Sequence, residues 1–355
     1  MGPQLQIQDT RIGNDFSPYV IAELSANHQG RIEQALALLE AAKLAGANAA
    51  KIQTYTADTM TIDHDGSDFQ LTNGLWSGRG LYELYEWAHT PWEWHEDLFK
   101  RGRELGITIF STPYDKSAVD FLEQFNPPAY KISSFELVDI PLIEHVASTG
   151  KPMFMSTGMA TQDEIAEAVT ASRKAGCKDL CLLHCTSGYP APAAEMDLRT
   201  ISELGKTFDV VPGLSDHTRG TTVPIAAVAL GACVIEKHLT LRRSDGGPDS
   251  LFSIEPSELE DIVQKIEIAH KAKGEIRKVP KPSESPQRSL RRSLYAVADI
   301  SAGEQFTEVN IRSIRPGFGL PPRALPAILG RTAAMDIPRG TAITWQFVDP
   351  DDTDS

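Results

Sequence analysis

Two stretches of the chain, VVPGLSDHT (residues 210–218) and CVIEKHLTL (residues 233–241), have the same design: a short apolar run that ends in polar residues. Neither run alternates strictly between apolar and polar residues, which is typical of parallel strands buried on both faces. Each carries a histidine near its end, His217 in the first and His238 in the second. The two stretches therefore predict adjacent buried strands that bring two imidazoles to the same edge of a sheet.

This design recurs along the chain, and helix-like amphipathic segments separate the runs. The runs are YVIAEL, AAKIQTY, ITIFSTP, AYKISS, PMFMSTG, LCLLHCT, VVPGLSD and CVIEKHLTL. One intervening segment, ATQDEIAEAVTASRKAG, opens with Thr161 three residues before Glu164, which is a capping-box pattern, and ends at Gly176. Strand–helix units of roughly 30 residues each, eight in all, predict an α/β protein with a (β/α)8 TIM barrel.

The composition changes after the barrel-like segment, which we predict to span residues 1–272. Residues 273–289, KGEIRKVPKPSESPQRS, are rich in proline, serine and charged residues and predict a linker. Residues 290–350 contain short strand-like runs, glycine turns and prolines, and residues 351–355 form an acidic tail. We therefore expect a small second domain, whose limited core favours packing against a neighbour.

The net charge of −14 over 355 residues argues against nucleic acid as a partner. No apolar stretch is long enough to span a membrane, and the N-terminus lacks the basic-then-apolar pattern of a secretory signal. The four cysteines form no CxxC pair and lie in or beside apolar segments, so we expect reduced thiols in a cytoplasmic protein.

Every predicted strand ends in polar residues. The carboxyl ends of the strands of such a barrel form one rim, where active sites lie. A single serine or threonine at such a place is more often a loop or helix cap, but a complete set of polar ends indicates a functional site. The residues are Glu23, Lys51, Gln53, Ser111, Thr112, Lys131, Ser133, Ser134, Ser156, Thr157, His184, Thr186, Ser187, Ser215, His217, Lys237 and His238.

The two histidines suit a divalent transition metal, with water and substrate in the remaining positions. A carboxylate such as Glu23 is placed to complete the shell or to hold a bound water. A lone buried histidine is usually structural, but two on neighbouring strand ends favour a metal site.

The rim lysines Lys51, Lys131 and Lys237, together with the nearby hydroxyls, suit a phosphate or carboxylate. Two other interpretations stay open. The lysines can pair with barrel carboxylates such as Glu236, or one can form a Schiff base with a carbonyl substrate. The histidine pair favours metal activation over the imine.

One predicted loop is unusually long. More than thirty residues separate KIQTY from the helix near WEWHEDLFKRGRELG, and they include Trp76, Tyr82, Tyr85 and Trp87. Loops of this length are usually functional or disordered. The aromatic residues predict a loop folded over the rim; the alternative is a helix packed on the side of the barrel.

Eight motifs in a fixed order resemble the sialic acid synthase family: IAELSANHQG, KIQTYTAD, STPYD, YKISSFE, STGM, LHCTSGYPAP, GLSDHT and VIEKHLTL. The resemblance extends from about residue 20 to residue 347. Three further stretches, GLWSGRGLYELYEWAHTPWEWH, RRSLYAV and RPGFGLPP, are most similar to the branch that makes pseudaminic acid. The resemblance implies that a small C-terminal antifreeze-like (SAF) domain follows the barrel.

The resemblance also implies an activity. Phosphoenolpyruvate would condense with an open-chain diacetamido sugar, with a divalent metal (Mn²⁺, Co²⁺ or Mg²⁺) as Lewis acid, in a domain-swapped homodimer. The implied catalytic residues are Glu23, Lys51 and Lys131, and the implied metal ligands are His217 and His238. The implied substrate contacts are Ser111, Thr112, Ser134, Ser156, Ser187, Tyr189, Ser215, Asp249 and Arg315, the last on the small domain.

The chain departs from the family pattern in places. Ser133 stands where relatives tend to carry alanine or glycine, and Gly188 precedes the implied sugar contact Tyr189. Sialic acid synthases tend to read E-x-G-x-N-H where this chain reads ELSANH at 23–28, which favours the pseudaminic branch. Alternatives are a legionaminic or N-acetylneuraminic acid synthase, a Schiff-base aldolase that uses Lys131 or Lys51, and a non-catalytic sugar-binding protein.

Overall fold

The computed structural model describes residues 2–350, and within them the chain divides into two compact units after Gly274. The acidic tail predicted at 351–355 lies outside the described residues. Each unit has its own apolar core.

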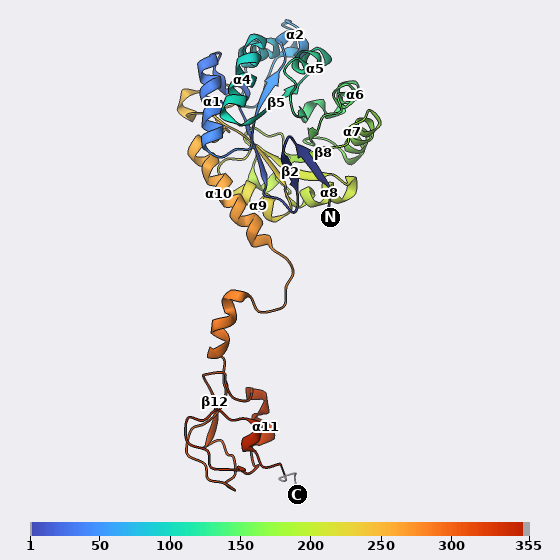
Figure 1. The fold of residues 1–355 in the computed structure, drawn as a ribbon. Helices are drawn as coiled ribbons and strands as arrows, with labels where there is room; N and C mark the ends of the chain where they lie inside the picture. The colour runs from blue at the N-terminus through green and yellow to red at the C-terminus, as the bar shows by residue number, and fades with distance from the viewer. Residues whose placement is uncertain (1, 351–355) are drawn as a thin grey trace. The chain divides into compact units, whose positions relative to one another are not determined.

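The first unit is a closed barrel of eight parallel strands, as predicted (Figure 1). Strands that follow one another in the sequence are hydrogen-bonded neighbours, and the last strand pairs with the first so that His238 lies opposite Glu23. The barrel strands are β3 (Tyr19–Glu23), β4 (Ala49–Thr54), β5 (Thr108–Pro113), β6 (Tyr130–Ile132), β7 (Met153–Ser156), β8 (Leu180–Cys185), β9 (Val211–Asp216) and β10 (Val234–His238).

Helices surround the barrel (Figure 1). They are α1 (Ile32–Leu44), α4 (His95–Leu105), α5 (Lys116–Glu123), α6 (Ile140–Ser148), α7 (Gln162–Lys174), α8 (Arg199–Phe208), α9 (Thr222–Ala229) and α10 (Pro256–Lys273).

The predicted capping box is present at the start of α7. The Thr161 hydroxyl accepts from the Glu164 amide at 3.3 Å, and the Glu164 carboxylate accepts from the Thr161 amide at 2.7 Å.

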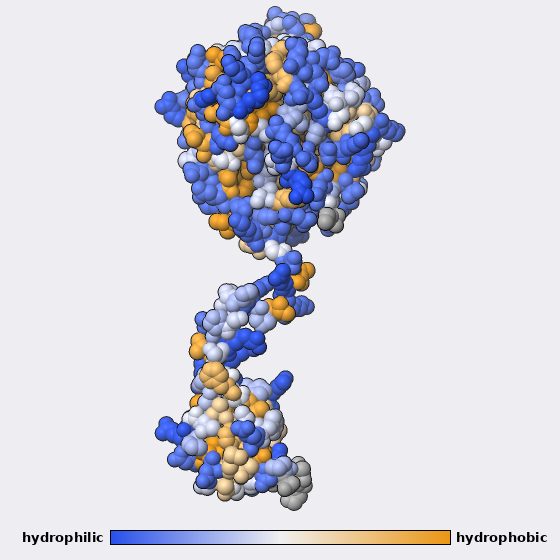
Figure 2. All heavy atoms as spheres, viewed as in Figure 1, coloured by the Kyte–Doolittle hydropathy of each residue, from blue (hydrophilic) through white to orange (hydrophobic). Residues whose placement is uncertain are grey.

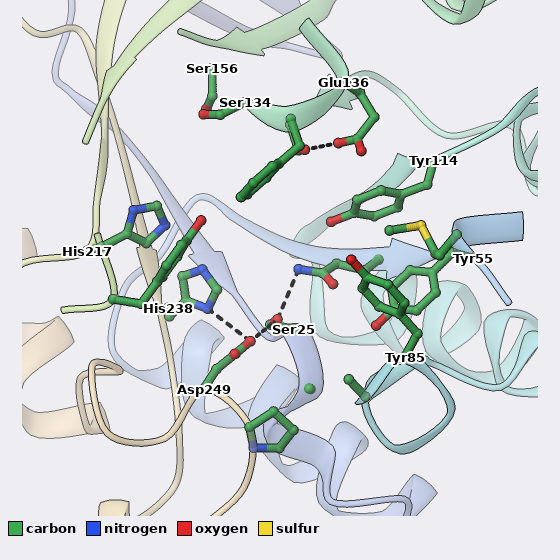
Figure 3. Close-up of a pocket in the computed structure, with 18 of the residues that line it drawn as sticks. Ser25, Tyr55, Tyr85, Tyr114, Ser134, Glu136, Ser156, His217, His238 and Asp249 are labelled. Atoms are coloured by element: carbon green, nitrogen blue, oxygen red, sulfur yellow. Dashed lines mark hydrogen bonds and ion pairs between the residues drawn. The ribbon is translucent and has the colours of Figure 1, made fainter. Parts of the chain in front are cut away.

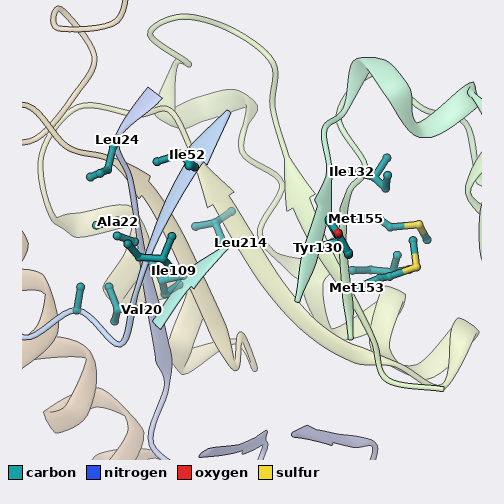
Figure 4. Close-up of a cluster of buried hydrophobic side chains, with 14 of the residues drawn as sticks. Val20, Ala22, Leu24, Ile52, Ile109, Tyr130, Ile132, Met153, Met155 and Leu214 are labelled. Carbon is teal, nitrogen blue, oxygen red and sulfur yellow. The ribbon is translucent and has the colours of Figure 1, made fainter. Parts of the chain in front are cut away.

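Side chains alternate along each strand between two apolar clusters. In β3, Tyr19 and Ile21 belong to the cluster inside the barrel, whereas Val20 and Ala22 belong to the cluster between barrel and helices. Figure 4 shows part of the outer cluster. Because the alternation continues to the strand ends, it decides whether a polar residue there faces the barrel mouth or the helices.

An N-terminal hairpin, which the sequence patterns did not predict, closes the other end of the barrel. Its strands β1 (Gln4–Ile7) and β2 (Thr10–Gly13) pair antiparallel. Leu5, Ile7 and Ile12 pack in the inner apolar cluster, with residues from the amino-terminal parts of the barrel strands. The hairpin fills the amino-terminal end and leaves the carboxyl end for a site.

The second unit is small and largely irregular. Its strands β11 (Ser293–Ala296) and β12 (Ile311–Ile314) pair antiparallel, and α11 (Leu325–Ile328) contributes to its core. The segment predicted as a linker contains a 3-10 helix, η7 (Pro282–Leu290), in which no residue is buried.

Short 3-10 helices occupy other loops: η1 (Ser25–His28), η2 (Ser67–Phe69), η3 (Trp92–Trp94), η4 (Phe135–Val138), η5 (Ala193–Glu195), η6 (Arg243–Asp245), η8 (Pro322–Ala324) and η9 (Trp345–Phe347).

The face shown in Figure 2 is mostly hydrophilic, with scattered apolar residues. Among residues 2–350, no helix has both the length and the apolar character needed to cross a membrane. All four cysteines are buried and free, as predicted.

Candidate active site

A cavity of about 410 Å³ lies at the carboxyl ends of the barrel strands (Figure 3). Its lining brings together nine of the predicted site residues: Lys51, Lys131, Ser134, Ser156, Tyr189, Ser215, His217, His238 and Asp249. These residues come from different strands and loops, so the barrel itself assembles the pocket.

The paired histidines lie on one side of the pocket, with ring centroids 5.3 Å apart (Figure 3). Nδ1 of His217 lies 3.2 Å from the Thr186 carbonyl oxygen, so in the neutral ring the proton is on Nδ1 and Nε2 is the acceptor. Nδ1 of His238 lies 3.6 Å from Oδ2 of Asp249. Burial, followed by the charge of His217, lowers the pKa of His238 well below its ordinary value and favours the neutral form.

The histidine pair fits a divalent metal as an open site. In the described part of the chain, no group of three or more histidine, cysteine, aspartate or glutamate side chains is arranged to hold a metal ion. The pocket therefore supplies two imidazoles, and water and substrate would fill the remaining positions. The Thr186 carbonyl orients the His217 ring, as a partner behind a metal ligand commonly does, and Asp249 lies near the His238 ring without a hydrogen bond to it.

Two lysines and two glutamates form a buried charge cluster. Nζ of Lys51 lies 2.5 Å from Oε2 of Glu23 and 3.7 Å from Oε1 of Glu236. Nζ of Lys131 lies 3.2 Å from the same oxygen of Glu236. All four side chains are at most 4% exposed, so each charge depends on its partners for stabilisation.

The cluster shifts the four pKa values differently. Burial raises the pKa of Glu23, although Lys51 opposes the shift. Burial alone would raise the pKa of Glu236, but Lys131 and Lys51 together hold it below its ordinary value. Burial lowers the pKa of Lys131, whereas the two glutamates outweigh burial and raise that of Lys51. Lys131 is therefore the lysine that loses its proton more readily.

Serine hydroxyls gather beside Gly158. The Gly158 amide donates to the Ser134 hydroxyl at 3.1 Å, and a side chain at position 158 would collide with the hydroxyls of Ser134 and Ser187. The Ser156 hydroxyl is buried and has no hydrogen-bond partner within the described chain. A buried unpartnered hydroxyl in a pocket wall points to a ligand that completes it.

Three predicted residues lie behind the pocket wall. Glu23 is fully buried beneath Lys51, and the Thr112 hydroxyl accepts from Lys51 at 2.9 Å. Ser111 follows Phe110, which faces the barrel interior, so Ser111 points outward. Its hydroxyl donates to the Ile52 carbonyl at 3.1 Å, in the layer beneath the helices.

Two more residues do not line the pocket. Ser187 lies next to the pocket, beside Gly158. Its Oγ is 3.8 Å from Sγ of Cys185, and Cys185 lines the pocket. Arg315 is exposed on the second unit.

The suggestion that Lys237 binds an anion at the rim is wrong. Lys237 lies between two inward-facing residues of β10, so its side chain points toward the helices. There Nζ lies 2.6 Å from Oδ2 of Asp216 and donates to the Thr218 carbonyl at 2.6 Å. The Lys237–Asp216 ion pair joins β9 to β10 on the helix side of the barrel, and each of its two residues directly precedes one of the two histidines.

The long loop after β4 folds over the pocket and contributes to its lining, as predicted. Nε1 of Trp76 donates to the Pro248 carbonyl at 2.9 Å, and the Trp76 ring lies 5.5 Å from that of Tyr189. The loop includes the short helices α2 (Ala57–Met60) and α3 (Leu81–Ala88).

The NeuB family profile matches residues 38–278, and the SAF domain profile matches residues 291–349. The chain belongs to the NeuB family. This confirms both the resemblance to the sialic acid synthases and the predicted SAF domain.

Similar members of the NeuB family include two enzymes named pseudaminic acid synthase. That of Campylobacter jejuni is 44% identical, over 94% of this chain and 98% of its own length. That of Helicobacter pylori is 42% identical, over 92% of this chain and 96% of its own length. The crystal structure of an N-acetylneuraminic acid synthetase from Leptospira borgpetersenii superposes with a TM-score of 0.73 at 30% identity, and covers 81% of this chain and 95% of that chain.

Sequence reasoning missed part of this NeuB-family pocket. A tyrosine wall faces the histidines across the cavity, with Tyr55 5.1 Å from Tyr114 and 5.8 Å from Tyr85 between ring centroids (Figure 3). Tyr55 directly follows β4 and Tyr114 directly follows β5. Their positions at the carboxyl ends of strands could therefore have predicted from the sequence that they line the pocket. Glu136 and Ser25 also line the cavity.

Replacement of Lys131 by methionine keeps the length of the side chain and removes its charge. If this lysine holds an anionic substrate, kcat/KM for that substrate should fall roughly 10²–10³-fold. Because the pKa of Lys131 is lowered, the wild-type profile should lose kcat/KM on its alkaline side, and this limb should be absent in the variant. Lys43→Met, an exposed lysine on α1, is the control. Wild-type kcat and KM in Lys131→Met would make Lys131 a structural residue.

Proposed function

We propose that this protein joins phosphoenolpyruvate to an open-chain diacetamido-trideoxy-altrose to give pseudaminic acid and inorganic phosphate. The observation that carries the proposal is a single pocket with lysines and hydroxyls in one part and a histidine pair in another. The first arrangement suits a phosphate ester and the second suits a metal that activates an aldehyde. The similarity to pseudaminic acid synthases over nearly the whole chain supports this choice of sugar.

The anionic end of phosphoenolpyruvate binds between Lys131, Lys51 and the serines around Gly158. Ser156 gains the hydrogen-bond partner that it lacks, and the close approach allowed by Gly158 leaves room for phosphate oxygens. Glu23 and Glu236 already pair with these lysines, so the incoming anion has to compete with the two carboxylates for the ammonium groups.

His217 and His238 would hold the divalent ion, which when bound supplies a Lewis acid for the aldehyde oxygen of the sugar. Asp249 faces the sugar next to these rings, 3.6 Å from His238. Tyr189 packs 4.6 Å from His217 between ring centroids and excludes water from this part of the pocket. Arg315 is proposed to contact the sugar from the SAF domain of a second copy.

The reaction forms a carbon–carbon bond and the bond between C2 and the water oxygen, and it breaks the bond between C2 and the phosphate oxygen. Of the two protons of the water, one ends on the former aldehyde oxygen and the other on the released phosphate. C3 of phosphoenolpyruvate attacks the aldehyde carbon, whose oxygen becomes a hydroxyl. Water adds to C2 and gives up a proton, and collapse of the tetrahedral intermediate releases phosphate and leaves a keto group. Glu23 is the proposed acceptor of that proton, since it becomes free when the substrate anion draws Lys51 away.

A Schiff-base aldolase is the second candidate, and one observation favours it. Lys131 lines the pocket and burial lowers its pKa, as an imine-forming lysine requires. Borohydride treatment of metal-free enzyme with a sugar should leave no covalent adduct on Lys131 if condensation is the activity. A trapped adduct would support the aldolase.

Phosphate release with phosphoenolpyruvate and a panel of sugars tests the main proposal. The diacetamido-trideoxy-altrose should be the best substrate, because the apolar part of the pocket with Met60, Leu71 and Leu84 suits a terminal methyl group. The legionaminic acid precursor, a diacetamido sugar of different stereochemistry, should be slower. N-acetylmannosamine adds a hydroxyl there and should be poorer by about 10²-fold. If N-acetylmannosamine outperformed every diacetamido sugar, the proposed substrate would be wrong.

Removal of metal tests the histidine pair. A chelator should abolish turnover, and Mn²⁺, Co²⁺ or Mg²⁺ should restore it. His217→Ala and His238→Ala should each reduce turnover severely while circular dichroism stays unchanged, because both side chains line the cavity. His145→Ala, on the surface of α6, is the control. Full turnover in metal-free buffer would contradict the Lewis-acid role.

Mixed dimers test whether the SAF domain serves a second copy. His217→Ala disables the barrel and Arg315→Ala disables the cap. Equal amounts of the two variants, dissociated and reassembled together, should give about one quarter of sites with an intact barrel and an intact cap if pairing is random. If each cap served its own barrel, the mixture would be no more active than the average of the two variants.

A further inference from the structure

Ser25 has an unusual backbone for a residue with a side chain. It begins η1, which a single residue separates from the end of β3, and its φ is +42°, in the left-handed region. Glycine adopts this region freely, whereas a residue with a Cβ is strained there. Of the non-glycine residues with positive φ in the described chain, Ser25 is the only buried one. The strain therefore lies in the pocket wall and calls for a compensating contact.

The compensating contacts all involve the hydroxyl of Ser25 or the turn that it makes. The hydroxyl donates to Oδ2 of Asp249 and accepts from Nε2 of Gln53 at 2.9 Å (Figure 3). The hydroxyl of Ser25 thus ties the Asp249 carboxylate to Gln53.

These bonds connect the lysine–glutamate cluster of the pocket to the side that holds the two histidines. Gln53 also donates to Oε1 of Glu23 at 3.1 Å, and Oδ2 of Asp249 lies 3.6 Å from Nδ1 of His238. The Ser25 hydroxyl is the only atom in this chain of contacts that both donates and accepts. Without it, the Asp249 carboxylate loses its link to Gln53.

We propose that Ser25 is a positioning residue for the acceptor sugar: its hydroxyl fixes the Asp249 carboxylate in the orientation that receives a sugar hydroxyl. The inference rests on the proposed function, in which Asp249 contacts the sugar. A glycine at position 25 would relieve the backbone and keep the turn, so what the serine adds at this position is its hydroxyl. Phosphoenolpyruvate, held by Lys131, Lys51 and the serines around Gly158, makes no contact with Ser25 or Asp249 in this proposal.

Two variants separate the hydroxyl from the backbone strain. Ser25→Gly removes both, and Ser25→Ala removes the hydroxyl alone. In both, kcat/KM for the sugar should fall about ten- to a hundred-fold, the effect of losing one charge-assisted hydrogen bond, mainly through a higher KM. KM for phosphoenolpyruvate should stay within about two-fold. Binding of the reduced, open-chain alcohol of the sugar, measured by calorimetry, should weaken in parallel.

Thermal unfolding gives the matched control. Asn126→Gly relieves a similar backbone, with φ of +50°, at an exposed position outside the cavity lining. Ser25→Gly and Asn126→Gly should unfold at or above the wild-type temperature, and only Ser25→Gly should affect the sugar. Ser25→Ala should show no gain in unfolding temperature.

Several results would overturn the inference. Wild-type sugar kinetics in both variants would mean that the hydroxyl is not used. Recovery in Ser25→Gly but not in Ser25→Ala would assign the role to the backbone turn. Equal losses for both substrates would indicate a general effect on the pocket. A wild-type protein inactive with every sugar would instead overturn the proposed function, and this inference with it.

Discussion

The alternation of side chains along the strands of a closed barrel is the constraint on which the rest of this structure depends. Neighbouring residues of one strand belong to different environments, one inside the barrel and one beneath the helices. In β10, Glu236 and His238 reach the pocket, whereas Lys237 between them pairs with Asp216 in the outer layer. Apolar side chains and the hairpin fill the amino-terminal end of the barrel interior, and the pocket that holds the predicted site residues lies at the carboxyl end.

Charge in that pocket is balanced before any substrate arrives. Lys51 and Lys131 face Glu23 and Glu236, and each ammonium lies within 3.2 Å of a carboxylate oxygen. A buried lysine without such a partner would favour its neutral form. The pairing keeps cationic groups available in a protein whose net charge is −14, and an anion that enters meets lysines already in place.

The pocket also joins elements that are distant in the sequence. Tyr85 comes from the long loop after β4, Tyr189 from the loop after β8, and Asp249 from the loop after β10. The Trp76 indole holds the long loop to the Pro248 carbonyl, so the aromatic wall and Asp249 are fixed relative to one another. Rigid strands position the charged groups, and loops supply the surfaces that distinguish one sugar from another.

The sequence by itself determined the barrel, the small second domain, the histidine pair and the lysines, because buried parallel strands and their polar ends are local patterns. Tertiary structure decided which polar ends reach the pocket, because facing direction depends on how the barrel closes. Ser111 and Lys237 look like Ser156 and Lys131 in the sequence, yet they point toward the helices. The hairpin plug and the left-handed turn at Ser25 were beyond local patterns, since each exists only through contacts made across the folded chain.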